Sequence, residues 1–428
     1  MEAQGYLESL ELFGMRFGLD RMRRLVTALD IEVERLRAVQ VLGTNGKSST
    51  TRMVAAILRR HALRTGAYLS PHLGSFAERI EFDERPLSQG EFAAGVQHAA
   101  QAAELVGRGL AAGDHVTQFE VLTAAAFDVL WRAEIDVAVV EAGLGGRFDA
   151  TSVIEPSIVT LTNVGLEHTR WLGPTERHVA EEKLAVVPAG STIVAGPLGP
   201  EALSVAMQTA DERGATLLRF GFDVTVERDG TDFAVRTAAG SYGGLVLNPR
   251  GSFQRTNFAL AVATAESFLG RALDLDAVLD AAHEVKVPGR LESVSDDPLV
   301  LFDGAHNPTA AAALRASLPE VIGERKLTGV MSILDDKDAA AMLSTLLPLF
   351  ERTVFTRSSH PRSLSPATLE SLARQLSGPP SEVVLAPEQA LERAVALAGS
   401  EGAVLVTGSI YLLSDLVRAR ATRISRAV

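Results

Sequence analysis

The sequence contains no cysteine, which excludes disulfide bonds, thiolate nucleophiles and zinc-thiolate sites. Long apolar runs are also missing, because no uninterrupted apolar stretch approaches the roughly 18–20 residues that a membrane span needs. The first residues have neither the basic segment nor the apolar core of a secretory signal. No basic patch stands out and the net charge is −12, which disfavours a nucleic-acid partner. We therefore expect a cytoplasmic protein that binds neither nucleic acid nor membrane.

Short apolar and β-branched runs alternate with longer helix-like segments, in a chain of 428 residues that is 46% apolar. This alternation is typical of an α/β protein, in which buried parallel strands read as continuous apolar runs. Residues 222–247 instead alternate apolar and polar side chains between glycines, which predicts a small antiparallel element. In the first half of the chain we expect parallel strands at residues 38–42, 136–141, 157–162 and 192–195.

The pattern restarts after Pro288-Gly289-Arg290, where proline and glycine punctuate the chain. Because the chain is longer than one core usually supports, we expect two domains. Residues 1–288 are predicted to form a P-loop-type domain with a mostly parallel sheet flanked by helices. Residues 289–428 are predicted to form a Rossmann-like α/β domain, with strands at residues 299–302, 328–332, 353–356, 382–385 and 403–407.

The most informative segment is a glycine-broken turn that follows the first predicted strand. Such a turn points backbone N–H groups, the positive end of a helix and a lysine at one place, which favours a polyphosphate. Val41 stands where the usual P-loop pattern has glycine, so the turn is a shortened variant, and an ordinary strand-to-helix connection is the alternative. The turn, called here the phosphate turn, consists of Gly43, Thr44, Asn45, Gly46, Lys47, Ser48 and Ser49.

Polar residues follow two other predicted strands and one further short apolar run, residues 67–69, and open α/β sheets bind ligands at the carboxyl ends of strands. Glu141 closes one strand and precedes a second glycine turn with Asp149, His168 follows another strand, and Ser70 ends the short apolar run. A hydroxyl, a carboxylate and an imidazole together favour Mg²⁺ beside ATP phosphates. The same groups would suit a hydrolase triad, but Ser70 lacks the G-x-S-x-G elbow. Taken singly, Glu141 also fits an exposed strand end, and His168 an ordinary surface or core histidine.

Three further segments have ordinary structural interpretations when each is taken alone. Lys183, in Glu181-Glu182-Lys183, is most simply a solvated charge on a helix. Residues 251–257 either cap a helix or present amide groups to a base. Residues 303–308 end a predicted strand and are the best candidate site of the second domain, although Asn307 alone fits a helix cap.

In their order along the chain, these segments resemble the Mur ligase superfamily, and within it the branch of folylpolyglutamate and dihydrofolate synthases. The phosphate turn is similar to the GTNGKGS turn of the branch, and residues 70–73 to its SPHL segment. Residues 141–151 are similar to its E-x-G-L-G-G-R-x-D-A-T segment. Further matches lie at residues 78–80, 117–120, 166–169, 182–183, 254 with 257, 288–292 and 303–308, so the resemblance extends over almost the whole chain.

The resemblance implies a role for each matching residue. The phosphate turn would hold the ATP phosphates, with Lys47 bridging the outer ones. Lys183 matches the lysine that is carbamylated in the family, which turns a cation into a carboxylate able to hold a second Mg²⁺. The other implied roles are Mg²⁺ ligation by Ser70, Glu141 and His168, ATP contacts by Gln254, Asn257, Arg290 and Asp303, catalysis by Lys47, Lys183 and His306, and folate contacts by Phe119 and Asp149.

The implied reaction joins L-glutamate to the carboxylate of folate or dihydropteroate. ATP first phosphorylates the carboxylate, and the glutamate amine then attacks the acyl phosphate, so that positioning and charge neutralisation dominate catalysis. Closure of the second domain over the first would exclude water from this intermediate. The resemblance thus implies ATP and two Mg²⁺ ions as cofactors and small molecules as partners, and we expect a monomer.

Four residues depart from the pattern of the branch, namely Ser48, Ser152, Glu167 and Phe253. Ser48 makes the turn similar to the Lys-Thr of cell-wall Mur ligases and adds a hydroxyl that would meet Mg²⁺. The other three concern nucleotide and folate contacts, so a Mur-type ligase acting on a non-pterin acid is the second hypothesis. A nucleotide-binding protein without ligase chemistry is the third, and the retention of Lys47, Glu141, His168 and Lys183 argues against it.

Overall fold

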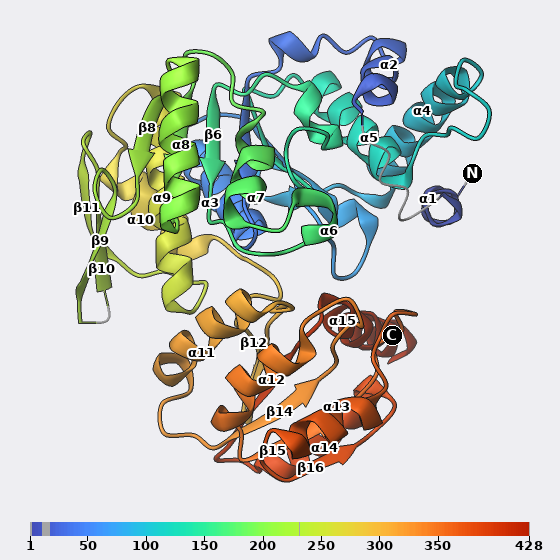
Figure 1. The fold of residues 1–428 in the computed structure, drawn as a ribbon, viewed down its shortest axis with the longest axis vertical. Coiled ribbons are helices and arrows are strands. Elements are labelled where there is room, and N and C mark those ends of the chain that lie inside the picture. The colour runs from blue at the N-terminus through green and yellow to red at the C-terminus, as the bar shows by residue number, and fades with distance from the viewer. Residues whose placement is uncertain (1, 11–17, 231, 428) are drawn as a thin grey trace. The chain divides into compact units, whose positions relative to one another are not determined.

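The computed structural model describes residues 2–10, 18–230 and 232–427, which divide into two compact units (Figure 1). The first unit comprises the described residues of 1–71, 75–246 and 256–285. The second comprises residues 72–74 and 247–255 and the described residues from 286 onward. Each unit combines helices with its own sheet, which confirms the α/β class, whereas the boundary at residue 288 stays a prediction.

The sheet of the first unit is mostly parallel, as predicted, and β1 is buried along its whole length. Its antiparallel pairs are β2 with β3 and β3 with β4. Sequence periodicity missed β3, β4 and β8, which are short or only partly buried. The strand order is β4 (Arg85–Pro86), β3 (Ile80–Phe82), β2 (Thr65–Tyr68), β5 (Val137–Glu141), β1 (Ala38–Leu42), β6 (Ile158–Leu161), β7 (Thr192–Ala195) and β8 (Thr216–Arg219).

The register of this sheet brings three strand ends together. β1 pairs in parallel with β5 on one side and with β6 on the other. Val41 lies opposite Glu141, and Leu42 opposite Leu161. The carboxyl ends of β5, β1 and β6 are therefore neighbours, and loops that leave them meet at one edge of the sheet.

Apolar cores join helices of the first unit to this sheet. One core joins α2, α4 and α5 to β1, β2 and β5, and another joins α7 and α8 to β6 and β7. Both α4 and α5 begin with a capping box, Ser88 with Glu91 and Thr117 with Glu120, which fixes where each helix starts. The helices are α1 (Ala3–Ser9), α2 (Asp20–Ala28), α3 (Lys47–Arg60), α4 (Gln89–Gly107), α5 (Gln118–Arg132), α6 (Thr169–Leu172), α7 (Glu176–Leu184), α8 (Pro200–Arg213), α9 (Ser252–Leu269) and α10 (Leu275–Glu284), with 3₁₀ turns η1 (Val33–Arg35), η2 (Phe76–Arg79) and η3 (Ala150–Val153).

The predicted antiparallel element is confirmed as a separate sheet. It consists of β9 (Thr225–Asp229), β10 (Asp232–Arg236) and β11 (Ser241–Leu245), in the order β11, β10, β9. Phe233 and Val235 alternate with more exposed residues along β10, which is the pattern of a sheet with one buried face.

The second unit has a six-stranded sheet that is parallel except for β12, and helices lie between its parallel strands. This confirms the expected Rossmann-like arrangement and adds β12, which the sequence reading missed. The strand order is β12 (Glu292–Asp296), β13 (Leu299–Phe302), β17 (Ala403–Thr407), β14 (Leu327–Met331), β15 (Arg352–Phe355) and β16 (Ser381–Val383). The helical segments are α11 (Pro308–Ile322), α12 (Ala339–Leu346), η4 (Leu347–Leu349), α13 (Pro366–Gln375), α14 (Pro387–Ala398) and α15 (Ile410–Ala427). Among the described helices, none has the length and apolar character needed to cross a membrane.

Candidate active site

The phosphate turn joins β1 to α3, and glycine is required at two of its positions. Gly46 is the N-cap of α3 with a φ of 83°, and Gly43 has a φ of 147°. A β-carbon on Gly43 would overlap the Thr162 hydroxyl, and one on Gly46 would lie 2.6 Å from Asn257 Oδ1. Because a glycine N-cap brings no side-chain acceptor, the N–H groups of the first turn of α3 keep the arrangement that suits an anion.

The loop after β6 holds the phosphate turn in place. The Asn163 side chain accepts a hydrogen bond from the Asn45 N–H and donates one to the Asn45 carbonyl, both at 3.0 Å. The Gly165 N–H donates to the Thr44 hydroxyl at 3.0 Å. Sequence reasoning missed Asn163, although its place just after a buried strand was a usable signal.

Two lysine side chains converge on one carbonyl of the phosphate turn. Lys47 Nζ donates to the carbonyls of Gly43 and Thr44, each at 3.1 Å. Lys183 Nζ, from α7, donates to the Gly43 carbonyl at 2.8 Å. Lys183 is only 4% exposed, so the interpretation as a solvated charge is wrong. Burial, and secondarily the Lys47 ammonium, lowers the pKa of Lys183 to about 7.

Glu141 lies at the end of β5 and is 1% exposed, so the interpretation as an exposed strand end is also wrong. Its Oε2 accepts a hydrogen bond from the Ser70 N–H, and its Oε1 accepts one from the Ser48 hydroxyl, both at 3.0 Å. The unusual serine at position 48 therefore touches the buried carboxylate directly. Carboxylate and hydroxyl oxygens are the donors that Mg²⁺ prefers, and this set fits that ion.

The second glycine turn, residues 143–149, is organised by Asp149. Its carboxylate accepts hydrogen bonds from the Leu144 N–H at 2.7 Å and the Thr151 N–H at 3.0 Å. Burial raises the pKa of Asp149, and these backbone bonds oppose the rise. Gly146 packs closely on α7, where a β-carbon would lie 2.5 Å from the Lys183 carbonyl. The ring of Phe119 packs closely on Gly143, so one of the two predicted folate residues contacts this turn and the other, Asp149, is part of it.

A cavity of about 20 Å³ lies between the two glycine turns. Its lining includes Lys47, Lys183, Glu167 and His168. His168 has a φ of 52°, and its Nε2 lies 3.7 Å from the Glu167 carboxylate. Within the described part of the chain, no three His, Asp or Glu side chains form a metal-binding group on their own. A metal at this edge would therefore need hydroxyl or phosphate oxygens as well.

The predicted residues of the second unit form a cluster after β13. The Asp303 carboxylate accepts hydrogen bonds from the N–H groups of Leu291 and Ala305, at 2.9 and 2.8 Å. Burial raises the pKa of Asp303, and the Arg290 guanidinium opposes the rise. His306 Nδ1 lies 2.9 Å from the Gly304 carbonyl. Asp303 thus ties the segment that carries Arg290 to the one that carries His306.

The two predicted nucleotide residues of α9 are both buried. Gln254 is fully buried in the first turn of the helix, and Asn257 is 6% exposed. Asn257 Oδ1 lies against Gly46 of the phosphate turn, as the space around that glycine shows.

We predict that Glu141→Gln raises the Mg²⁺ concentration for half-maximal activity by at least about tenfold, because a neutral amide is a weaker ligand than a carboxylate. Titration of Mg²⁺ at saturating ATP measures this, with Glu155→Gln, an exposed carboxylate of the same unit, as control. An unchanged Mg²⁺ requirement in Glu141→Gln would contradict the assignment.

We predict that Asp149→Asn lowers the free energy of unfolding by about 1–3 kcal/mol, because an amide cannot accept all the hydrogen bonds that this buried carboxylate receives. Urea unfolding measures the change. Asp280→Asn, on an exposed position of α10, is the control and should unfold like the parent protein. Equal stability of Asp149→Asn and the control would show that the carboxylate does not organise the turn.

The comparisons with known families agree with this geometry. A family model described as "Mur ligase middle domain" matches residues 41–265. A second, described as "Mur ligase, glutamate ligase domain", matches residues 289–410. The chain therefore belongs to the Mur ligase family.

Individual relatives and solved structures define the branch. A Bacillus subtilis protein named dihydrofolate synthase/folylpolyglutamate synthase is 30% identical over 427 residues, which are 97% of each chain. A Haloferax volcanii protein named probable bifunctional folylpolyglutamate synthase/dihydropteroate synthase is 35% identical, and the chain spans 50% of its length. Mycobacterium tuberculosis folylpolyglutamate synthase complexed with ADP matches with a TM-score of 0.91 and 31% identity, over 97% of this chain and 96% of that one. E. coli FolC in complex with DHPP and ADP matches with a TM-score of 0.87 and 29% identity, over 98% and 97%. Within the family, the chain falls in the folylpolyglutamate synthase/dihydrofolate synthase branch.

Proposed function

We propose that this chain is an ATP-dependent ligase that joins L-glutamate to the carboxylate of folate or dihydropteroate and releases ADP and phosphate. The observation that carries the proposal is the convergence of Lys47 and Lys183 on the Gly43 carbonyl, beside the buried Glu141. Membership of the branch supports the choice of substrates, because the similar E. coli FolC has a structure in complex with DHPP and ADP. The two lysines and the carboxylate are what a phosphoryl-transfer site needs.

The reaction has two steps. An oxygen of the acceptor carboxylate attacks the γ-phosphorus of ATP, the bond to the β-phosphate oxygen breaks, and ADP leaves. The glutamate amine then attacks the acyl carbon, the carbon–oxygen bond to phosphate breaks, and the amine releases a proton as the amide forms. The phosphate turn and the N-terminus of α3 orient the triphosphate, and Lys47 neutralises charge that develops on the transferred group.

Mg²⁺ and a carbamate on Lys183 are the cofactor chemistry that we propose. Glu141, with the hydroxyls of Ser48 and Ser70, would hold Mg²⁺, and His168 would complete the set. When bound, Mg²⁺ supplies neutralisation of phosphate charge. A carbamate on Lys183 would replace the repulsion between two neighbouring ammonium groups by an attraction, and it is the carboxylate we assign to a second Mg²⁺.

The remaining assignments are part of the same proposal. Arg290, Asp303 and His306 act on the nucleotide and the reacting groups, Gln254 and Asn257 lie near adenine and ribose, and Phe119 contacts the acceptor. The protein acts as a cytoplasmic monomer with domains at residues 1–288 and 289–428.

The test is ADP release by purified protein with ATP, Mg²⁺ and L-glutamate, with dihydropteroate and tetrahydrofolate supplied in separate assays. We expect glutamate-dependent ADP release with at least one of the two acceptors. No release with either would refute the proposed function.

The second candidate function is a Mur-type ligation of a different acid. The contact between Ser48 and Glu141 favours it, since the Lys47-Ser48 pair is similar to the Lys-Thr pair of cell-wall Mur ligases. An acceptor screen distinguishes the two, because faster turnover of a non-pterin acid would support the second candidate.

A further inference from the structure

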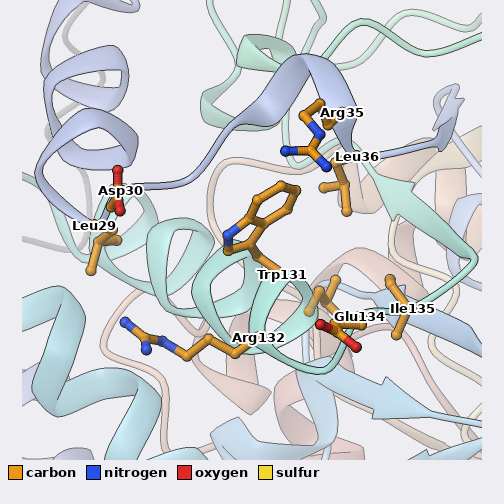
Figure 2. Close-up of a pocket in the computed structure, with 9 residues that line it drawn as sticks. Leu29, Asp30, Arg35, Leu36, Trp131, Arg132, Glu134 and Ile135 are labelled. Carbon is orange, nitrogen blue, oxygen red and sulfur yellow. The ribbon is translucent and has the colours of Figure 1, made fainter.

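A second, larger hollow lies in the first unit near the amino ends of β1 and β5, whereas the phosphate turn lies at the carboxyl end of β1. Its volume is about 530 Å³, which is within the size range of small-molecule sites. Leu36 and Ile135 in its lining lie two residues before the first residues of β1 and β5, whose carboxyl ends carry the phosphate turn and Glu141. The last residues of α5 and the residues that follow α2 complete the lining (Figure 2).

Trp131 is one of the lining residues, and Figure 2 shows its indole between the other labelled side chains. Its indole is partly exposed, while Leu29, Leu36 and Leu130 beside it are buried. The guanidinium of Arg35 lies 5.8 Å from the centroid of the indole ring. The ring face therefore already attracts one cation, as the negative face of an aromatic ring does.

The two arginines of the lining are neutralised by carboxylates outside it. Arg35 pairs with Glu32 at 3.1 Å. Arg132 pairs at 2.7 Å with Asp128, whose side chain is 1% exposed. Each of these cations therefore already has a carboxylate partner outside the hollow.

The two carboxylates of the lining are not neutralised in this way. Within residues 2–10, 18–230 and 232–427, neither Asp30 nor Glu134 has a side-chain hydrogen bond or ion pair. Each follows the end of a helix, α2 or α5, in the left-handed conformation, with φ of 57° and 49°. The Arg64 guanidinium donates hydrogen bonds to the backbone carbonyls of Ala133 and Glu134, and not to the Glu134 carboxylate. The uncompensated charge of the hollow is therefore negative, at two helix ends that add to it.

We propose that this hollow binds an aliphatic diamine, whose two ammonium groups pair with Asp30 and Glu134 while its methylene chain covers Trp131. Figure 2 shows the two carboxylates on opposite sides of the indole, so one small cation does not satisfy both. The apolar side chains between them match a methylene chain, and the ring face favours a nearby cation. This site takes no part in the ligase reaction, and the proposal stands independently of the proposed function.

The test follows the fluorescence of Trp131 in a Trp171→Phe background, which leaves one tryptophan in the chain. The probes are α,ω-diamines from propane to octane, each compared with the monoamine of the same length. We expect a saturable change with at least one diamine, which binds at least about threefold more tightly than its monoamine and weakens as salt is added. Asp30→Asn and Glu134→Gln should each weaken binding by about two- to fivefold, and Glu155→Gln should not.

Three results would overturn the proposal. The first is the absence of a saturable response to every diamine, and the second is equal binding of diamine and monoamine at every length. The third is tighter binding of benzoate than of any diamine, which would mean that the arginines set the charge of the hollow. Calorimetry with Trp131→Leu is a further check, because unchanged diamine affinity in that variant would exclude the ring. Circular dichroism of each variant establishes that it is folded.

Discussion

Lys47→Ala is expected to lower kcat/KM for ATP by about 10²–10³-fold. The ammonium of Lys47 lies on the carbonyls of the phosphate turn, where the outer phosphates of ATP bind in our proposal. A preorganised charge at a transferring phosphoryl group has effects of this size, because it costs no reorganisation during the reaction. Initial rates of ADP release at varied ATP concentration measure the loss, and calorimetry with a non-hydrolysable ATP analogue measures the binding component.

The matched control for this prediction is Lys326→Ala, because Lys326 is largely exposed and pairs with Glu351 at the surface. We expect that variant to retain the parent kinetics. If Lys47→Ala kept both its kcat/KM and its affinity for the analogue, the phosphate turn would not be the ATP site. Removal of Lys47 should also raise the pKa of Lys183, since the Lys47 charge contributes to its depression.

Depletion of dissolved CO₂ is expected to reduce activity by at least about tenfold, and bicarbonate should restore it. The pKa of Lys183 is about 7, so near neutral pH a large fraction of its amine is uncharged, whereas an ordinary lysine is almost fully protonated. The neutral amine attacks CO₂ at carbon, forms the carbamate and releases one proton. Because a lone pair is required, carbamate at constant dissolved CO₂ should increase as the pH rises through about 7.

Lys183→Met tests this chemistry directly. We expect a loss of at least about 10²-fold in kcat, with no response to bicarbonate. Carbon-13 NMR with labelled bicarbonate should show a carbamate signal in the parent protein that is absent from Lys183→Met and retained in Lys326→Met. A parent protein with full activity in CO₂-free buffer and no such signal would exclude the carbamate, even if Lys183→Met were inactive for structural reasons.

The sequence predicted the central strands well because buried parallel strands need continuous apolar, β-branched runs. β1, β7, β13 and β17 have the predicted bounds, and β5 and β6 differ only at their ends. The sequence did not predict four strands, because their short or mixed sequences form strands only by pairing with their neighbours. These are β3, β4, β8 and β12. The glycines of the phosphate turn were also predictable from the sequence, because a positive φ and close neighbouring atoms exclude larger side chains at Gly43 and Gly46.

The burial of Lys183 and Glu141 could not be predicted from the residues next to them in the sequence. Both have sequences that suit an exposed helix or strand end, and both are buried. Their burial depends on contacts with residues far away in the chain, such as Gly43 for Lys183 and Ser48 for Glu141. Only the resemblance to a family, carried by many segments at once, anticipated their use together.

The sequence by itself determined the α/β class, the places of the central strands and the polar residues at their ends, because periodicity and glycine requirements are local properties. The tertiary structure decided the state of those polar residues. Packing of α7 on the second glycine turn buries Lys183 and lowers its pKa to about 7. The same packing brings the Gly43 carbonyl, 140 residues away in the sequence, within 2.8 Å of Lys183 Nζ. Burial and charge proximity arise from segments distant in sequence, and for this reason the chemistry of the site depends on the fold.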